Sequence, residues 1–249
     1  MGSPCHRYLT AEVRFPGGPG WAIITGMHLL LSGVVGSVAY GLAGPGSDTD
    51  RIGVFAAPTV AFHGLRPPRE SVVTTEPDVT LHEARKYALL ALSGNPTATE
   101  LMWLPEDCYE TRTGFGAELI TIRSAFLSAP RVRDAYLGYA SQQFRKLATA
   151  PADSGGRRRS AKHARHLARL LHQGRVLYAT GVLEIRLADP EWFRAFGERV
   201  AGGALDEAQA LVATAEAEFG RIRSPLPERP DEETVERWLL AVRAAHLPR

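Results

Sequence analysis

Cysteine is nearly absent from this chain of 249 residues, which contains only Cys5 and Cys108. Two cysteines this far apart exclude a disulfide framework and a zinc site built from thiolates, and such sparse use of cysteine is typical of a reducing compartment. The segment Met1–Pro16 also lacks the basic and then apolar order of a signal peptide. We therefore expect a cytoplasmic protein.

Long hydrophobic runs are lacking as well. The most apolar stretch, Trp21–Val35, is interrupted by His28 and, at about 15 residues, is shorter than the roughly 20 that a membrane-spanning helix needs. We interpret it as buried strand and expect no membrane partner. The net charge is only +2, so the total charge does not by itself indicate binding to nucleic acid.

Charge is nevertheless divided unevenly along the chain. Residues 1–120 contain 8 Lys and Arg against 12 Asp and Glu, a net charge of −4, whereas residues 121–249 contain 21 against 15, a net charge of +6. An acidic first half followed by a basic second half is typical of two parts that bind ligands of opposite sign.

Short apolar runs occupy the first half, and Gly, Pro or Asp bounds each of them, as expected of strands. Apolar residues at helical spacing from Glu83 to Ser93, ended by Gly94, predict one helix among them, and a shorter helix is expected over Thr97–Trp103. The predicted strands are His28–Val35, Ile52–Phe55, Val72–Thr75 and Val79–Leu81.

The second half is helical in pattern from residue 117 onward. A segment rich in Gly, Ser and Arg, Asp153–Arg159, predicts a surface loop within it. Strands followed by helices indicate the α+β class, with a small mixed β-sheet core in residues 1–116 and an α-helical C-terminal region in residues 117–249. The predicted helices are Glu118–Ser128, Arg131–Lys146, Ser160–Thr180, Leu205–Phe219 and Asp231–His246.

Gly36 and Ser37 follow the first long apolar strand and open a short predicted helix over Val38–Leu42. A glycine lets a ligand approach the backbone, and free N–H groups at the start of a helix favour phosphate. The next predicted strand begins with Asp48 and Asp50, which face the same side because strand residues alternate. Two neighbouring carboxylates suit Mg²⁺ shared with substrate phosphates. The combination indicates nucleotidyl transfer.

This arrangement of Gly36-Ser37, ten intervening residues and then Asp48-x-Asp50 resembles the signature of the DNA polymerase β-like nucleotidyltransferase superfamily. Other segments resemble the predicted nucleotidyltransferases that include the RNA-ligase-associated group, and the resemblance extends over residues 28–187. These segments are Leu81–Tyr87, Gly94–Trp103 and Lys162–Gly174.

The resemblance implies a role for each residue of the motif. Gly36 and Ser37 would hold the triphosphate, and Asp48 and Asp50 would ligate Mg²⁺, as two ions, with Mn²⁺ as an alternative metal. The superfamily uses a third carboxylate from a later strand. Asp78, at the head of a short apolar strand, is expected in this position, either as a metal ligand or as the group that deprotonates the acceptor hydroxyl.

The third carboxylate has a competing candidate in Glu83, which lies just past the same strand. Strand alternation places Asp78 and His82 on one face. His82 is a further candidate for contact with the base or a phosphate, although a structural role in a hydrogen bond is equally open. Lys86, close to Glu83 in sequence, is another candidate for the nucleotide site.

A basic stripe is predicted on the helix over Ser160–Thr180, where Lys162, Arg165, His166 and Arg169 recur at helical spacing. Lys162 and Arg169 are candidate contacts to the nucleotide phosphates, and Arg165 is a further one. A solvated basic face without a ligand is the alternative. The stripe indicates a polyanionic partner without identifying it.

Together these features predict an Mg²⁺-dependent nucleotidyltransferase that moves an NMP, with ATP as the favoured donor, to an acceptor hydroxyl and releases pyrophosphate. The expected acceptor is an RNA 3′ end, which the basic stripe and the resemblance to RNA-ligase-associated members both favour. The alternatives are adenylylation of a small hydroxylated molecule or of a protein, and a regulatory protein that binds a nucleotide without turnover.

Overall fold

The computed structural model describes residues 10–13, 22–25, 27–149 and 154–248. Its centre is a five-stranded mixed sheet in the order β5-β6-β4-β3-β7, in which β4 and β6 are parallel and the other neighbours antiparallel. Strands β1 (Thr10–Val13) and β2 (Ala22–Thr25) pair separately. The central strands are β3 (His28–Val35), β4 (Asp50–Ala56), β5 (Ser71–Thr75), β6 (Asp78–Glu83) and β7 (Tyr109–Arg112).

The strand predictions are confirmed, β3 with its bounds and the other three with one to three further residues each. In β6 the predicted alternation is present, because Val79 and Leu81 are buried whereas Asp78 is exposed. Strand β7 was not predicted, since Tyr109–Arg112 is a mostly polar segment without an apolar run. It becomes a strand by pairing with the edge of β3.

Helices make up most of the remaining chain, and together with the sheet they confirm the α+β class. Among the residues described, no helix has the length and apolar character needed to cross a membrane. Three 3₁₀ turns cover Thr59–His63, Glu106–Cys108 and Arg123–Phe126. The α-helices are α1 (Gly36–Tyr40), α2 (Ala84–Leu92), α3 (Pro96–Leu101), α4 (Gly114–Thr121), α5 (Ala129–Ala148), α6 (Ser154–Thr180), α7 (Pro190–Ala201), α8 (Leu205–Arg221) and α9 (Glu232–Ala245).

The loop predicted over Asp153–Arg159 is wrong within the described residues, because α6 already begins at Ser154. The two glycines there suggested a break, but Gly156 is buried. The three arginines after it are good helix formers, and their side chains are exposed on the first turns of α6.

Helix α7 was missed, although the sequence carries its start signals. The Asp189 carboxylate accepts a hydrogen bond from the Trp192 backbone N–H, and Pro190 occupies the first turn. Phe193 and Phe196 form the buried face of this helix.

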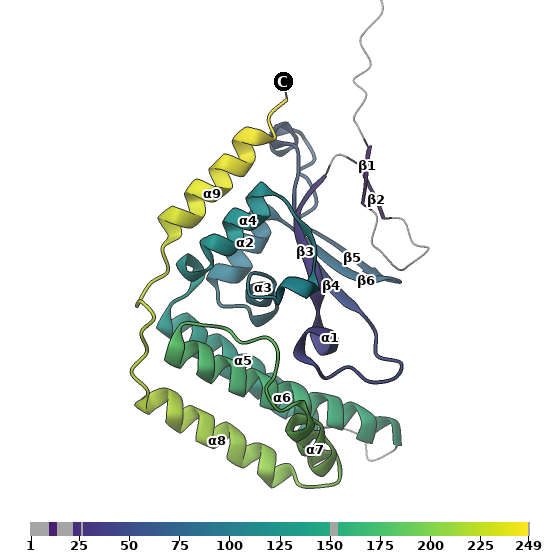
Figure 1. The fold of residues 1–249 in the computed structure, drawn as a ribbon, viewed down its shortest axis with the longest axis vertical. Helices are drawn as coiled ribbons and strands as arrows, with labels where there is room; N and C mark the ends of the chain where they lie inside the picture. The colour runs from purple at the N-terminus through teal and green to yellow at the C-terminus, as the bar shows by residue number, and fades with distance from the viewer. Residues whose placement is uncertain (1–9, 14–21, 26, 150–153, 249) are drawn as a thin grey trace, which may run out of the picture.

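The helices form two groups around the sheet (Figure 1). Helices α2, α3 and α4 lie beside the sheet, whereas α5, α6, α7 and α8 pack together beyond the end of β3 and β4 that carries α1. One hydrophobic core connects the two groups, with Leu31 of the sheet, Leu101 of α3 and Leu170 of α6 each almost completely buried in it. Helix α1 therefore lies where the sheet meets the helical layer.

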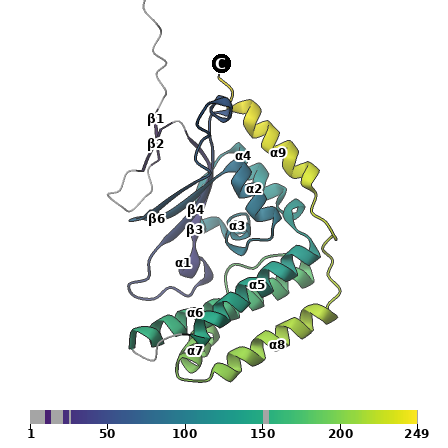
Figure 2. The same cartoon turned by 180° about the vertical axis from the view of Figure 1, so that it is seen from behind.

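The C-terminal helix α9 leaves the helical layer and returns to the sheet half (Figure 2). There it packs against α2 and α4. The Arg243 guanidinium forms an ion pair with Glu83, at 2.6 and 2.9 Å, and the Trp238 indole donates to the Phe115 carbonyl at 3.1 Å. Residues 232–245 are helical, as expected, but they pack against α2 and α4 beside the sheet rather than against the other C-terminal helices.

Candidate functional site

Gly36 and Asp50 lie side by side where β3 passes into α1. Asp50 begins β4 and pairs in register with Val35, the last residue of β3, so that Gly36 follows directly beside it. A Cβ built on Gly36 would lie 2.2 Å from Oδ2 of Asp50, and the backbone of Gly36 has a φ of +70°. Both features require glycine here, because a side chain would be strained and would displace the carboxylate.

Asp78 reaches the same end of the sheet from the neighbouring strand. It is the first residue of β6, and the parallel register joins Arg51 of β4 to Val79 of β6. Asp50 and Asp78 therefore stand one residue before paired positions on adjacent strands. The expected start of the strand at Asp48 is wrong, because β4 begins at Asp50 and Asp48 lies two residues before it. The side chain of Asp48 is exposed, like that of Asp78.

The electrostatics of Asp50 reflect these neighbours. Partial burial raises the pKa of Asp50 above its usual range, the charge of Asp78 raises it further, and the charge of Asp48 adds to the effect. The Lys162 ammonium acts in the opposite direction. Lys162 is an exposed residue of α6, so the helical layer contributes a cation to the end of the sheet where the carboxylates gather.

The donor atoms at this end of the sheet are carboxylate oxygens, which is the chemistry that Mg²⁺ and Mn²⁺ prefer. As the side chains stand, no group of three or more His, Cys, Asp or Glu within the described residues is arranged to hold a metal ion. The charges of Asp48 and Asp78 thus act on Asp50, although the three carboxylates do not form a closed set of metal ligands. Like charges of this kind are relieved by a bound cation.

Ser37 lies in the first turn of α1 and is partly buried. Its carbonyl accepts hydrogen bonds from the backbone N–H groups of Leu42 and Ala43, at 2.8 and 2.9 Å. Gly41 ends the helix in the left-handed region, with a φ of 77°. The backbone that carries Gly36 and Ser37 is thus a closed turn against the end of the sheet.

Arg169 does not line this site, which contradicts its prediction as a phosphate contact. Its side chain is only 6% exposed, its Nη1 donates to Oε1 of Glu100 at 2.6 Å, and its guanidinium lies 4.0 Å from the ring centroid of Tyr40. The prediction assumed a solvated stripe on α6, but at Arg169 this helix faces Tyr40 of α1 and Glu100 of α3, which cover the side chain.

The other candidates lie at the opposite end of β6 from Asp78. His82 and Glu83 end this strand and Lys86 follows in α2, so the fold does not bring them to the three aspartates. Glu83 pairs in register with Phe55, near the end of β4 that is remote from Asp50. Its carboxylate caps α2 through the Arg85 backbone N–H in addition to its ion pair with α9. It is therefore committed to structure, and the competing assignment of Glu83 as third carboxylate is wrong.

The other two candidates on this part of the chain have structural partners as well. His82 Nδ1 is 2.8 Å from the Ser71 hydroxyl on the neighbouring strand β5, and burial lowers the pKa of His82. Lys86 Nζ lies 3.5 Å from the carboxylate of Glu70. Neither contact joins these residues to the end of the sheet that carries Asp50.

Arg165 points toward α7 rather than toward the carboxylates. Its Nη1 lies 3.5 Å from Oε1 of Glu198, and its stem packs over Gly197, where an added Cβ would come within 2.6 Å of Arg165 Cγ. About two turns earlier, Arg157, Arg158 and Arg159 are exposed on the same helix as Lys162. The basic residues of α6 thus divide into an exposed N-terminal group and a packed group.

Sequence reasoning missed the residues that connect α1 to the helical layer. Arg194 of α7 donates from Nη2 to the Gly41 carbonyl at 2.8 Å, and the Leu187 backbone N–H donates to the Tyr40 carbonyl at 3.2 Å. No local signal could have found them, because each joins segments more than 140 residues apart.

The chain matches a known protein family over most of its length. The profile of the RNA repair pathway DNA polymerase beta family matches residues 22–217. A solved nucleotidyltransferase-like protein from Exiguobacterium sibiricum is similar at 12% sequence identity and a TM-score of 0.37, over 79% of this chain and 72% of that one. No curated protein sequence matches the chain. Because the family profile covers most of its length, the chain belongs to the RNA repair pathway DNA polymerase beta family, a group of polymerase β-like nucleotidyltransferases.

Proposed function

We propose that this protein transfers an NMP, from ATP as the favoured donor, to an acceptor hydroxyl. The observation that carries the proposal is the position of Asp50, which stands beside the side-chain-free backbone of Gly36 and within the fields of Asp48, Asp78 and Lys162. Carboxylates and the Lys162 ammonium near a glycine turn are suited to a triphosphate and its divalent cation. Membership of a nucleotidyltransferase family supports the same reaction class.

In the proposed reaction the acceptor hydroxyl oxygen forms a bond to the α-phosphorus, the bond from that phosphorus to the β-phosphate oxygen breaks, and pyrophosphate leaves. Asp48, Asp50 and Asp78 would hold Mg²⁺, or Mn²⁺ in its place. When bound, the metal neutralises charge on the attacking and departing oxygens. Asp78 is exposed at the start of β6, so as an alternative to holding the metal it would accept the proton of the hydroxyl.

The remaining residues bind rather than react. Gly36 lets a phosphate oxygen approach the backbone without a steric clash, and Ser37 would add a hydroxyl donor beside it. Lys162 would contact the triphosphate, since its charge already acts on Asp50 from the facing helix. Arg169, buried in an ion pair, has no part in this contact.

The acceptor we propose is an RNA 3′ end. The exposed arginines 157–159 continue the basic face of α6 away from Lys162, so a polyanion could extend along the helix from the site. The link of the family with RNA repair favours this acceptor over a small hydroxylated molecule or a protein. A regulatory protein that binds a nucleotide without turnover remains the contrasting class.

The proposal is tested by incubating the protein with each α-labelled NTP and Mg²⁺, and offering RNA, a small-metabolite extract and protein in separate reactions. We expect label from ATP to enter RNA, and to be lost with EDTA or in Asp50→Asn. Asp206→Asn is the matched control, because Asp206 is an exposed aspartate on α8. Label in the metabolite or protein pool alone would replace the acceptor. Absence of label from every pool would overturn the transferase proposal in favour of nucleotide binding.

A further inference from the structure

The helix that carries Gly36 and Ser37, α1, is too short to be stable without contacts to other elements, because it contains five residues. Its first residue, Gly36, is held by the sheet, because the preceding residue, Val35, pairs with Asp50. Its last residue, Tyr40, contacts Arg169 of α6. What fixes Tyr40 therefore also fixes the turn beside the carboxylates.

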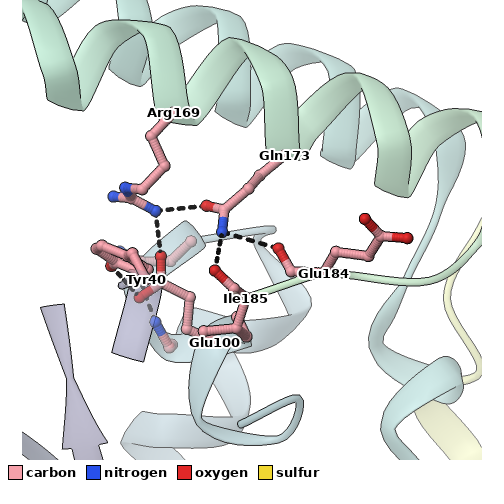
Figure 3. Close-up of polar contacts among 8 residues, drawn as sticks. Tyr40, Glu100, Arg169, Gln173, Glu184 and Ile185 are labelled. Atoms are coloured by element: carbon pink, nitrogen blue, oxygen red, sulfur yellow. Dashed lines mark hydrogen bonds and ion pairs between the residues drawn. The ribbon is translucent and has the colours of Figure 1, made fainter. Parts of the chain in front are cut away.

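Tyr40 is fixed by a buried acid and a buried base (Figure 3). Its hydroxyl donates to Oε2 of Glu100 at 2.6 Å, while Arg169 donates to the other carboxylate oxygen and stacks its guanidinium on the Tyr40 ring. All three residues are buried, and the side chains of Glu100 and Arg169 are only 2% and 6% exposed. Each oxygen of Glu100 thus has its own donor, one from α1 and one from α6.

Gln173 extends this arrangement and closes it into a ring. Its Oε1 accepts from Arg169 Nη1 at 2.5 Å, and its Nε2 donates to the carbonyls of Glu184 and Ile185, at 2.9 and 3.3 Å. Two residues further on, the Leu187 N–H donates to the carbonyl of Tyr40. We call Tyr40, Glu100, Arg169 and Gln173 the Tyr40 cluster.

Stability alone gives no reason for such a cluster, because a buried ion pair is usually no more stabilising than apolar side chains of the same size. Its distinguishing property is directional, since a carboxylate whose two oxygens accept from a hydroxyl and from a guanidinium holds both donors in a defined geometry. Among the described residues it joins α1, α3, α6 and the connection to α7 at one point. That point is three residues from Ser37.

We propose that Arg169 is a positioning residue, which through Glu100 and the Tyr40 ring holds α1 so that Gly36 and Ser37 face the nucleotide. The inference rests on the proposed function for the identity of the ligand, but not for the positioning itself. Arg169 would thus affect the site without touching phosphate or metal, because it contacts Tyr40 at the end of α1 remote from Gly36.

The test compares Tyr40→Phe and Arg169→Lys with the wild-type protein by amide hydrogen exchange and by steady-state kinetics at 25 °C. Tyr40→Phe removes only the hydroxyl, whereas Arg169→Lys keeps the charge and loses the planar guanidinium that stacks on the Tyr40 ring. We expect faster exchange confined to residues 36–43 and a KM for ATP raised about tenfold, the loss expected for one hydrogen bond to a charged group. The KM for the acceptor should not change.

The matched control is Arg243→Lys, because Arg243 also pairs with a buried glutamate, in its case through two nitrogens, and stacks on an aromatic ring, with its Cζ 4.2 Å from the Phe62 centroid. This control should lower the melting temperature without changing exchange in residues 36–43 or the KM for ATP. If Arg169→Lys does not fold, Tyr40→Phe decides the question.

Unchanged exchange in residues 36–43 of Tyr40→Phe would overturn the positioning role. An equal rise in Arg243→Lys would overturn it too, because the cluster would then act only through global stability. A wild-type protein that transfers no nucleotide would overturn the proposed function alone, since the exchange measurement still decides whether the Tyr40 cluster holds α1.

Discussion

Gly36 and Asp50 share a space that a methyl group cannot enter, since a Cβ at position 36 would lie 2.2 Å from the Asp50 carboxylate oxygen. The two residues are separated by fourteen positions in the chain but are neighbours through the pairing of β3 with β4. Glycine is therefore required at position 36 by the adjacent carboxylate as well as by the turn. The position of the α1 backbone and that of the Asp50 carboxylate depend on each other.

Gly36→Ala should therefore abolish nucleotide transfer while the protein remains folded. Its control is Gly46→Ala, because Gly46 has a similar φ of +78° but an added Cβ there meets nothing within 4 Å. We expect both variants to lose about 1 kcal/mol of unfolding free energy from the left-handed backbone. Only Gly36→Ala should lose transfer, measured as label incorporated per folded molecule. Equal activity in the two variants would contradict the role of the contact.

Asp78 and Glu83 occupy opposite ends of one strand and should respond in opposite ways to loss of charge. Asp78→Asn changes an exposed side chain, so the free energy of unfolding should change by less than about 0.5 kcal/mol. Its transfer rate should fall by about 100-fold or more, as when one charge-stabilising group of an active site is removed.

Glu83→Gln should instead be destabilising by about 3 kcal/mol, because the Arg243 guanidinium keeps its charge in a buried site without a carboxylate partner. Its transfer rate per folded molecule should stay near that of the wild type. Urea unfolding and initial rates on the same preparations check both variants. Loss of activity in Glu83→Gln with unchanged stability would reverse the assignment of the third carboxylate.

Local patterns in the sequence predicted what depends on local structure. The apolar run of β3, the alternation in β6 and the pair Asp48 and Asp50 are each visible within a few residues. The approach of Asp78 to Asp50 could not be derived in this way, because it depends on the parallel register between β4 and β6. Resemblance to a family, not periodicity, pointed to Asp78.

Long-range packing explains the errors. Helical spacing on α6 placed Lys162 and Arg169 in one predicted stripe, but spacing does not tell which part of a helix is covered by other elements. Lys162 lies on an exposed early turn, whereas Arg169, two turns later, is enclosed where α6 meets α3 and α1. Glu83 is a plausible metal ligand from the sequence alone, because its partner, Arg243 of the C-terminal helix, lies 160 residues away in the chain.

The exposed arginines of α6 should govern the salt dependence of RNA binding. Arg157→Ala combined with Arg158→Ala should lower the magnitude of the slope of log K against log salt by about 1.4, if each contacts one phosphate of a single strand. The control is Arg223→Ala combined with Arg229→Ala, which removes the same charge from exposed positions between α8 and α9. Binding titrations between 50 and 200 mM salt, roughly the range over which this effect is large, measure the slope. Equal slopes in both double variants would contradict an acceptor path along α6.

Protonation of α6 histidines should make the protein less stable in mild acid. Burial lowers the pKa of His166 to about 3, and the nearby Arg169 charge contributes. The folded state therefore keeps this ring neutral, whereas the unfolded chain binds a proton below the ordinary value of 6.5. Because the unfolded state binds more protons, the stability present above pH 6.5 is lost progressively as the pH falls from 6.5 toward 3.

Between pH 6.5 and 5.5 this single histidine should cost about 1 kcal/mol of unfolding free energy. Other histidines whose pKa is lowered by burial add to the same trend, and they are His28, His82, His163 and His172. Urea unfolding at pH 7.5, 6.5 and 5.5 measures the loss, and His166→Gln should make the dependence shallower because glutamine binds no proton. An identical pH dependence in His166→Gln and wild type would mean that His166 takes up its proton equally in both states.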